Sequence, residues 1–435
     1  DVIADLGNEG KTNKENAKDV EKKEVQSKLL YHQEGVTSTV GLRRGVEETL
    51  SGDACWVRQV LLVNSKPDAS LGVLFKKPAG GCKELLEGRL GNGFAMSPEG
   101  DTETQVLSGL LPICLYAGEK EPRSALVIGW GSGITVGAAL QSPLRELTAV
   151  ELEQKVVDAA RYFEPYNNIP QRDPRLTLIN ADGRNFLAAS KSKFDVVISE
   201  PSNPWMAGCG NLFTQEFFQQ VREHLEPDGI FLQWLQAYEI APENVWSILG
   251  TISGVFESVH VFNSARAKTD LLLIARRSRG KFEWDKVAKR MATSGIREQF
   301  QKVEIYGPGD LFVRMIAGTK GVRRISSHAP KNTDDNARIE FEAPKDLVNY
   351  RRFSPYEIVS QLKKTLGDPR SELANIPENS GDEFCWAEIR AGRESEAVKR
   401  EDAGYVCKEA AKFFNDGLSS KVLGSPTISA GKALQ

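Results

Sequence analysis

The stretch SALVIGWGSGITVGAAL, residues 124–140, decides the fold class of this chain. It opens with a short apolar run, continues with Gly129, Gly131 and Gly133 at alternate positions, and ends in small residues that favour a helix. Glycine adopts positive φ readily and lets other groups approach the backbone closely. The order therefore predicts a buried strand, a tight turn and a helix, which is the start of an α/β unit.

The glycine spacing limits what this turn can bind. A dinucleotide fingerprint needs G-x-G-x-x-G, but the sixth position here is Ile134, so the fit to NAD is poor. The spacing suits a nucleoside ligand without a pyrophosphate, such as S-adenosylmethionine. A plain glycine turn without a ligand is the alternative.

Three further apolar strands each lead into an acidic residue, namely Glu151, Asp182 and Glu200. Parallel strands of an open α/β sheet bind ligands at their carboxyl ends, so these groups are expected at one edge of the sheet. Glu151 is placed to accept the ribose hydroxyls, and Asp182, followed by Gly183, to meet the adenine amino group. The alternatives are a solvated strand end for Glu151 and a helix N-cap for Asp182.

The segment DVVISEPSNPW, residues 195–205, carries the candidate chemistry. Pro201 and Pro204 stop the strand directly after Glu200, because proline fixes φ and lacks an N–H. A carboxylate in a cleft can attract an ammonium, align it and take its proton. We therefore expect Glu200 to act as a general base, although a surface glutamate in a strand–turn is the alternative.

Eight segments between Leu29 and Pro344 resemble the spermidine/spermine synthase family. The resemblance is closest to its bacterial branch, whose synthase-like domain is often fused behind membrane helices. The matching segments are TQVLSGLLP (104–112), LVIGWGSG (126–133), AVELEQKVVDAARYF (149–163), ADGRNFL (181–187), DVVISEPSNPW (195–205), NLFTQEFF (211–218), FLQWLQAYEI (231–240) and NTDDNARIEFEAP (332–344).

The resemblance implies a class I methyltransferase-like Rossmann fold, mostly parallel with an antiparallel last strand, behind a small N-terminal antiparallel β-domain. It also implies decarboxylated S-adenosylmethionine as aminopropyl donor, or S-adenosylmethionine itself, and an amine acceptor such as putrescine. The expected residues are Glu200, Asn203 and Tyr238 for catalysis, Gly129, Gly131, Ser132, Gly133, Glu151, Asp182 and Gly183 for the nucleoside, and Gln105, Trp205 and Trp234 for the substrate.

The chain departs from the family pattern at four places. Ser132 replaces the acidic residue of the family's glycine loop, Glu200 replaces an aspartate, Asn203 replaces a second aspartate, and Thr104-Gln105 replaces a Tyr-His pair. Two alternatives to aminopropyl transfer therefore stay open. One is an S-adenosylmethionine-dependent methyltransferase of unknown acceptor, and the other is a catalytically silent nucleoside-binding or assembly domain.

The composition of the chain limits the classes of partner that we expect it to bind. The 435 residues carry a net charge of −3, so nothing favours nucleic acid, and no apolar stretch predicts membrane insertion. Four histidines and six cysteines without a C-x-x-C pair predict no metal site. Cys385 and Cys407 could pair, but free buried thiols are the expectation. A cytoplasmic location is expected, either alone or as the soluble part of a membrane-anchored protein, and a homodimer stays open.

The domain prediction has four parts. Residues 1–28, charged and poor in large apolar groups, are expected to form a flexible linker. Because the sequence starts at Asp1 and not at Met, we also expect that a preceding segment was removed or that this is an excised domain. Residues 29–98 are expected to form the β-domain, with β-rich segments over 30–40 and 56–63, a turn over 64–70 and a long loop over 72–100. Residues 99–348 form the predicted catalytic domain, and 349–435 a helical tail with helices over 356–366, 384–390 and 405–414.

Overall fold

A computed structural model describes residues 26–93, 95–97, 100–378, 380–393, 399 and 407–408. Most of the predicted linker therefore lies outside the described residues, although positions 26–28 already belong to the first strand. Most of the predicted helix over 405–414 lies outside them as well.

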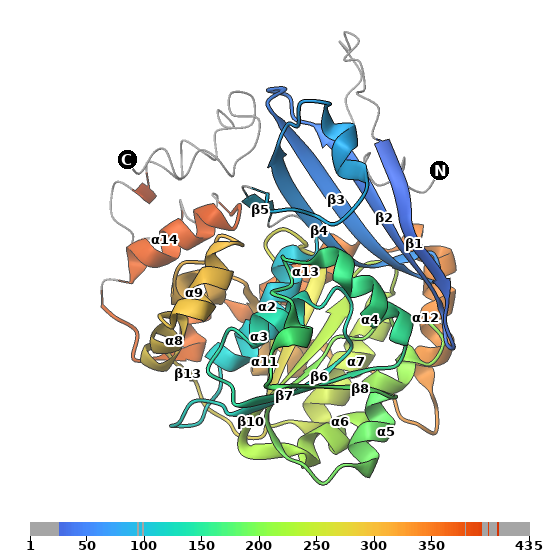
Figure 1. Cartoon of the computed structure of the whole chain (residues 1–435). Helices are drawn as coiled ribbons and strands as arrows, with labels where there is room; N and C mark the ends of the chain where they lie inside the picture. The colour runs from blue at the N-terminus through green and yellow to red at the C-terminus, as the bar shows by residue number, and fades with distance from the viewer. Residues whose placement is uncertain are drawn as a thin grey trace.

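An eight-stranded sheet forms the centre of the molecule (Figure 1). Its spatial order is β14-β11-β12-β10-β9-β6-β7-β8, in which β8, β7, β6, β9 and β10 are parallel and β12 runs antiparallel between β10 and β11. This arrangement confirms the predicted class I methyltransferase-like fold. The strands are β6 (Ser124–Ile128), β7 (Glu146–Glu151), β8 (Leu176–Asn180), β9 (Phe194–Ser199), β10 (Leu225–Gln236), β11 (Ser258–Asn263), β12 (Asp270–Arg276) and the unpredicted edge strand β14 (Met315–Ala317).

Helices cover both faces of this sheet, so the core has two layers of apolar side chains. One face packs against α2 (Thr102–Cys114), α3 (Ile134–Ala139), α4 (Gln154–Ala160), α8 (Trp284–Met291), α9 (Ser294–Gln301), α10 (Pro308–Phe312) and the tail helix α14 (Gly381–Arg390). The other packs against α5 (Gly183–Ala189), α6 (Gln215–Glu223), α7 (Pro242–Val255), α11 (Thr319–Ile325), α12 (Arg338–Asn349) and the second tail helix α13 (Pro355–Leu366). Among the described residues, no helix is long and apolar enough to cross a lipid bilayer.

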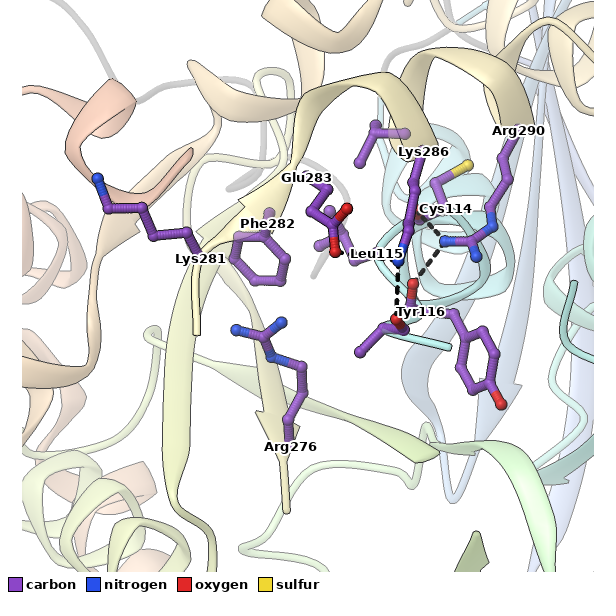
Figure 2. A pocket seen from close by; sticks show the side chains of 11 residues that line it. Cys114, Leu115, Tyr116, Arg276, Lys281, Phe282, Glu283, Lys286 and Arg290 are labelled. Carbon is purple, nitrogen blue, oxygen red and sulfur yellow. Dashed lines mark hydrogen bonds and ion pairs between the residues drawn. The ribbon is translucent and has the colours of Figure 1, made fainter. Parts of the chain in front are cut away.

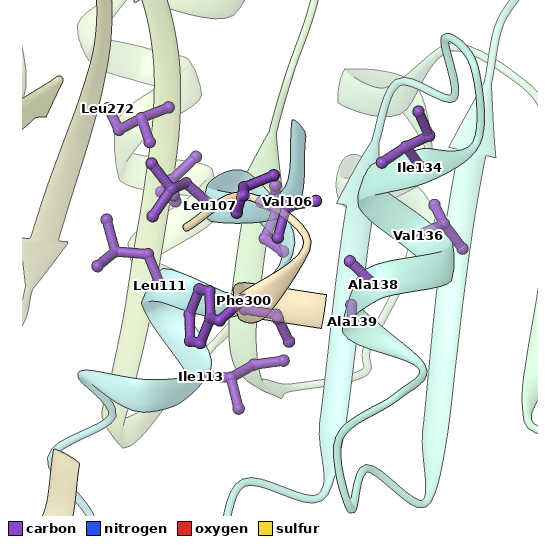
Figure 3. Close-up of a cluster of buried hydrophobic side chains, with 14 of the residues drawn as sticks. Val106, Leu107, Leu111, Ile113, Ile134, Val136, Ala138, Ala139, Leu272 and Phe300 are labelled. Atoms are coloured by element: carbon purple, nitrogen blue, oxygen red, sulfur yellow. The ribbon is translucent and has the colours of Figure 1, made fainter. Parts of the chain in front are cut away.

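Helix α2 is buried along its whole length and connects the core to the carboxyl edge of the sheet. Figure 3 shows its apolar side chains, among them Leu107 and Leu111, in one cluster with Leu272 of β12 and Phe300 of α9. Because neighbours hold this helix on all sides, its first turn has a fixed position beside the strand ends.

The N-terminal region is a five-stranded antiparallel sheet in the order β1-β2-β3-β4-β5. The β-rich segment 30–40 contains the end of β1 and the start of β2, because the chain turns back between these two strands. The predicted turn over 64–70 is too long. Asn64 and Ser65 both have positive φ, as in a two-residue hairpin, and β4 follows at once. The strands are β1 (Gln26–Glu34), β2 (Thr39–Glu48), β3 (Ala54–Val63), β4 (Lys66–Lys76) and β5 (Ala95–Ser97).

The expectation of free thiols is wrong for four of the six cysteines. Cys55 of β3 is bonded to Cys82 of the short 3-10 helix η1 (Cys82–Leu86), and Cys385 is bonded to Cys407. Cys114 and Cys209 are free. Cys55 and Cys82 are 27 residues apart in the sequence, so their spacing does not indicate a bond. They meet because the loop that carries Cys82 folds back onto β3.

The Cys55–Cys82 bond should contribute to stability through the 27-residue separation that it closes. In the chain-entropy account, a loop of this length contributes about 3.5 kcal/mol. We expect the Cys55→Ser/Cys82→Ser double variant to unfold at a clearly lower temperature than the wild type in a thermal melt. Cys209→Ser, which removes a free thiol, is the matched control, and equal melting of both variants would contradict the assignment.

Candidate active site

The glycine loop after β6 is tied directly to the two strands beside it. Gly129 donates its N–H to the carbonyl of Val150 at 2.9 Å, and Glu200 donates its N–H to the carbonyl of Ile128 at 2.9 Å. The three loop glycines have φ values of 100°, 53° and 81° at Gly129, Gly131 and Gly133. A Cβ on Gly129 would lie 2.3 Å from the carbonyl oxygen of Glu200, so this position requires glycine.

Glu151 lies at the end of β7 and holds the glycine loop from one side. Its carboxylate accepts the N–H of Trp130 at 2.9 Å and the N–H of Glu153 at 2.8 Å. Burial raises the pKa of Glu151 to about 7, although these two hydrogen bonds lower it. Each carboxylate oxygen can accept a second donor, so the group can also bind ribose hydroxyls.

Asp182 and Gly183 lie at the start of α5, next to β6. Asp182 accepts the N–H of Asn185 at 2.7 Å and caps the helix, which is the alternative role considered for it. A Cβ on Gly183 would lie 2.4 Å from Cγ2 of Ile128, so glycine allows the helix to approach the strand. A role of these residues in adenine binding stays a prediction.

Glu200 is half-buried where β9 ends, and its Oε2 accepts a hydrogen bond from the Thr135 hydroxyl at 2.5 Å. Burial raises the pKa of Glu200 to about 8, and the negative charges of Asp270 and Asp68 raise it further. Near neutral pH, and without a cation beside it, the group therefore holds a proton.

Three more carboxylates that the sequence interpretation missed lie around Glu200. Asp68 comes from β4 of the N-terminal sheet and accepts the Ser202 hydroxyl at 2.5 Å. Asp101 precedes α2, and Asp270 begins β12; burial raises the pKa of both. Because β12 is antiparallel, its first residue lies at the same edge as the ends of the parallel strands.

The aromatic and amide candidates separate into two groups. Asn203 donates to the Tyr238 hydroxyl at 3.4 Å, and the Trp234 side chain donates to Asp270. These three residues therefore belong to the carboxylate region, by which we mean the surroundings of Asp68, Asp101, Glu200 and Asp270. Burial raises the pKa of Tyr238, which is therefore a neutral hydroxyl. Trp205 is half-buried, with the Lys66 ammonium 5.6 Å from its ring centre.

Gln105 and Ser132 are engaged with each other. The Ser132 hydroxyl donates to the Gln105 side-chain oxygen, and the Gln105 amide donates to the carbonyls of Ser70 at 2.9 Å and Asp101 at 3.1 Å. The geometry of this pair fits a role in fixing the glycine loop against α2 and β4. Direct contact with the substrate stays a prediction.

A separate small pocket at the far end of α2 contains several cations (Figure 2). Two of these cations have partners at the end of α2: Arg290 donates to the carbonyls of Cys114 at 3.2 Å and Gly118 at 3.1 Å, and Lys286 pairs with Glu119 at 2.7 Å. Since the last carbonyls of a helix need such donors, this pocket has a structural role in capping α2.

Comparison with known proteins agrees with the family resemblance. Residues 109–265 match the spermine/spermidine synthase domain. A polyamine aminopropyltransferase of Buchnera aphidicola subsp. Acyrthosiphon pisum is 39% identical over 113 residues, which cover 25% of this chain and 39% of that protein. Putrescine N-methyltransferase 2 of Nicotiana tabacum is 30% identical over 138 residues, covering 31% of this chain and 39% of that protein.

Among solved structures, a spermidine synthase in complex with the transition-state analogue AdoDATO is similar, with a TM-score of 0.49 and 17% identity over 69% of this chain and 88% of that chain. The chain spans about two fifths of the length of the two curated relatives above. The recognition of the family from the sequence is confirmed over the matched residues.

We expect Glu151→Gln to weaken binding of methylthioadenosine about 10-fold to 150-fold, because a charge-assisted hydrogen bond contributes about 1.5–3 kcal/mol. Glu146→Gln, at the exposed start of the same strand, is the matched control. Calorimetric titration measures both. Affinity within twofold of the wild type for Glu151→Gln would remove this residue from the ribose site.

The raised pKa of Glu200 has a consequence for stability. The folded protein retains a proton that the unfolded chain releases near the ordinary pKa of glutamate, so this stabilising contribution is complete at low pH and is lost as pH rises through about 8. We expect the melting temperature of Glu200→Gln, relative to the wild type, to rise between pH 5 and pH 8.5. A constant difference across that range would contradict the assigned burial of the carboxylate.

Proposed function

We propose that this chain, whose residues 109–265 belong to the spermine/spermidine synthase family, transfers an aminopropyl group from decarboxylated S-adenosylmethionine to an amine. The observation that carries the proposal is the position of Glu200. Its backbone carbonyl lies against Gly129 of the glycine loop, and its carboxylate, which accepts the Thr135 hydroxyl, is near enough to Asp270 and Asp68 for their charges to act on it. Such a group of carboxylates favours a cationic acceptor beside a nucleoside site.

The donor supplies a sulfonium whose attached carbon is electrophilic. For the nucleoside part of the donor, we assign the glycine loop, which leaves room around Gly131, where the nearest atom to an added Cβ is 3.7 Å away. Glu151 would accept the ribose hydroxyls while its hydrogen bond to Trp130 keeps the loop in place. Asp182 and Gly183 would lie near the adenine.

Glu200 is assigned two tasks in turn. An amine with a pKa of about 10 arrives protonated, and a nearby carboxylate attracts it. The cation in turn lowers the pKa of Glu200, so that the ionised carboxylate can accept a proton from the amine as its nitrogen bonds to carbon and the C–S bond breaks. Thr135, which donates to Glu200 at 2.5 Å, would hold the carboxylate in position.

The other candidates are assigned to the walls of the acceptor site. Asn203 lacks a proton-accepting carboxylate and would orient Tyr238, to which it donates. Trp234 and Trp205 present aromatic surface, which suits an aliphatic or cationic acceptor.

The location of the protein is a separate question. A cytoplasmic location was expected, but two disulfide bonds argue for an oxidising compartment, since such bonds are rare where glutathione keeps thiols reduced.

The test of Glu200 as the base is a pair of rate measurements. We expect Glu200→Gln to lower kcat for methylthioadenosine formation about 10²-fold to 10⁴-fold, with donor affinity retained. The wild-type rate at subsaturating acceptor should rise with pH as the base and the amine both lose protons. Glu200→Asp, which keeps the carboxylate, is the control. Full activity of Glu200→Gln would show that the carboxylate is structural.

A further inference from the structure

The first turn of α2 contacts several parts of the candidate site. The Thr104 hydroxyl donates to Asp270 at 2.7 Å, and the Gln105 side chain accepts a hydroxyl from the glycine loop. The backbone carbonyl of Gln105 also lies 3.1 Å from the Thr135 hydroxyl, which contacts the Glu200 carboxylate. The position of this turn therefore affects the glycine loop and both carboxylates.

Glu103, in the same turn, anchors it to the segment before β14. Its side chain is fully buried and forms an ion pair with Arg314, in which the carboxylate lies 2.6 Å from Nε of the guanidinium. The carboxylate also accepts the Ser264 hydroxyl at 2.8 Å and the N–H of Ala265 at 3.2 Å. Burial raises the pKa of Glu103, but the Arg314 charge and these hydrogen bonds together hold it below its usual range. Glu103 is therefore ionised, and Arg314 compensates its charge.

The tail helix α14 supports Arg314 through α10. A terminal nitrogen of Arg314 donates to the backbone carbonyl of Asp310 at 2.5 Å. The Asp310 carboxylate is fully buried and forms a two-point ion pair with Arg390 of α14, with N–O distances of 2.7 and 2.9 Å. Aromatic packing joins the same elements, since the rings of Trp284 of α8 and Phe384 of α14 have centres 5.7 Å apart. A continuous chain of contacts thus connects the tail to the first turn of α2.

The two contacts of Arg314 use the fixed shape of the guanidinium. Its Nε binds Glu103 while a terminal nitrogen binds the Asp310 carbonyl, and the planar group fixes these donors relative to each other. A lysine at this position would keep the charge but present a single ammonium without that geometry. Complete loss of the charge would leave the buried Glu103 carboxylate uncompensated, which is costly.

We infer that Arg314 is a positioning residue of the active site and that the tail helix α14 supports it through Arg390 and Asp310. Arg314 acts through Glu103: it fixes the first turn of α2, and that turn holds the glycine loop and the carboxylate region in place. This inference rests on the proposed function, which assigns donor and acceptor to these two parts of the site. It also assigns a task to the tail, since Arg314, Asp310 and Arg390 all lie outside the matched family domain.

The test compares Arg314→Lys with Arg290→Lys, each measured well below its melting temperature. Both arginines are nearly fully buried and both bind α2, but at opposite ends of a helix of 13 residues, which is about 20 Å long. Both substitutions keep the charge and remove the guanidinium, so a purely structural role predicts equal activity of the two folded variants. We expect Arg314→Lys, but not Arg290→Lys, to lower kcat for methylthioadenosine formation about tenfold to a hundredfold, because small displacements of catalytic groups slow a reaction strongly.

A second readout does not depend on turnover. Exchange of backbone amide hydrogens, followed by mass spectrometry, measures local opening. Helix α6, on the other face of the sheet, serves as the internal reference for global stability. We expect the ratio of exchange in residues 129–135 to exchange in α6 to rise at least about threefold in Arg314→Lys, because the loop loses its support. Arg290→Lys should leave this ratio unchanged.

Arg390→Gln tests the same chain of contacts from its outer end. The Arg390 side chain is 21% exposed, and Asp310 would keep the N–H donors of Tyr306 at 2.9 Å and Gly307 at 3.1 Å, so this variant should fold. We expect the same rise in loop exchange, and a kcat lower by about twofold to thirtyfold, which is the range for residues that act through a contact network.

The outcomes distinguish this inference from the proposed function. Wild-type loop exchange in Arg314→Lys and Arg390→Gln, or an equal fall of kcat in Arg314→Lys and Arg290→Lys, would overturn the positioning role even if aminopropyl transfer occurs. A raised exchange ratio in Arg314→Lys and Arg390→Gln, in a protein that transfers no aminopropyl group, would support the positioning role and refute the proposed reaction.

Discussion

The shortage of positive charge around Glu200 and Asp270 is the physical constraint on which the site depends. Glu103 is fully buried, but Arg314 compensates its charge at 2.6 Å. Glu200 and Asp270 have hydroxyl donors instead, and neither forms an ion pair among the described residues. An isolated buried carboxylate is costly, so these groups hold protons until a cation arrives. The site is therefore built to gain stability when a positively charged ligand binds.

The topology of the sheet brings these groups together. Parallel strands end at one edge, which positions Glu151 and Glu200, and the antiparallel β12 begins at that edge, which positions Asp270. The N-terminal sheet covers the same edge and adds Asp68, whose hydrogen bond to Ser202 ties β4 to the segment after Glu200. Both sheets thus contribute carboxylates to this region.

Much of the central sheet could be predicted from the sequence, because apolar runs, glycines and acidic residues recur there in a regular order. The positions of Glu151 and Glu200 at the carboxyl edge of the sheet could be predicted in this way. Asp68 and Asp101 were missed because their segments show no pattern that links them to the cleft; only the packing of β4 and α2 does so. The Cys55–Cys82 bond was missed for the same reason, since pairing between distant segments depends on tertiary structure.

Aminopropyl transfer from a nucleoside donor to an amine is the reaction proposed for this site. Mass spectrometry of the products would identify it, with the purified protein given putrescine and either decarboxylated S-adenosylmethionine or S-adenosylmethionine. We expect an aminopropylated amine and methylthioadenosine, formed only from the decarboxylated donor. A methylated amine formed from S-adenosylmethionine, or no product from either donor, would contradict the proposed reaction.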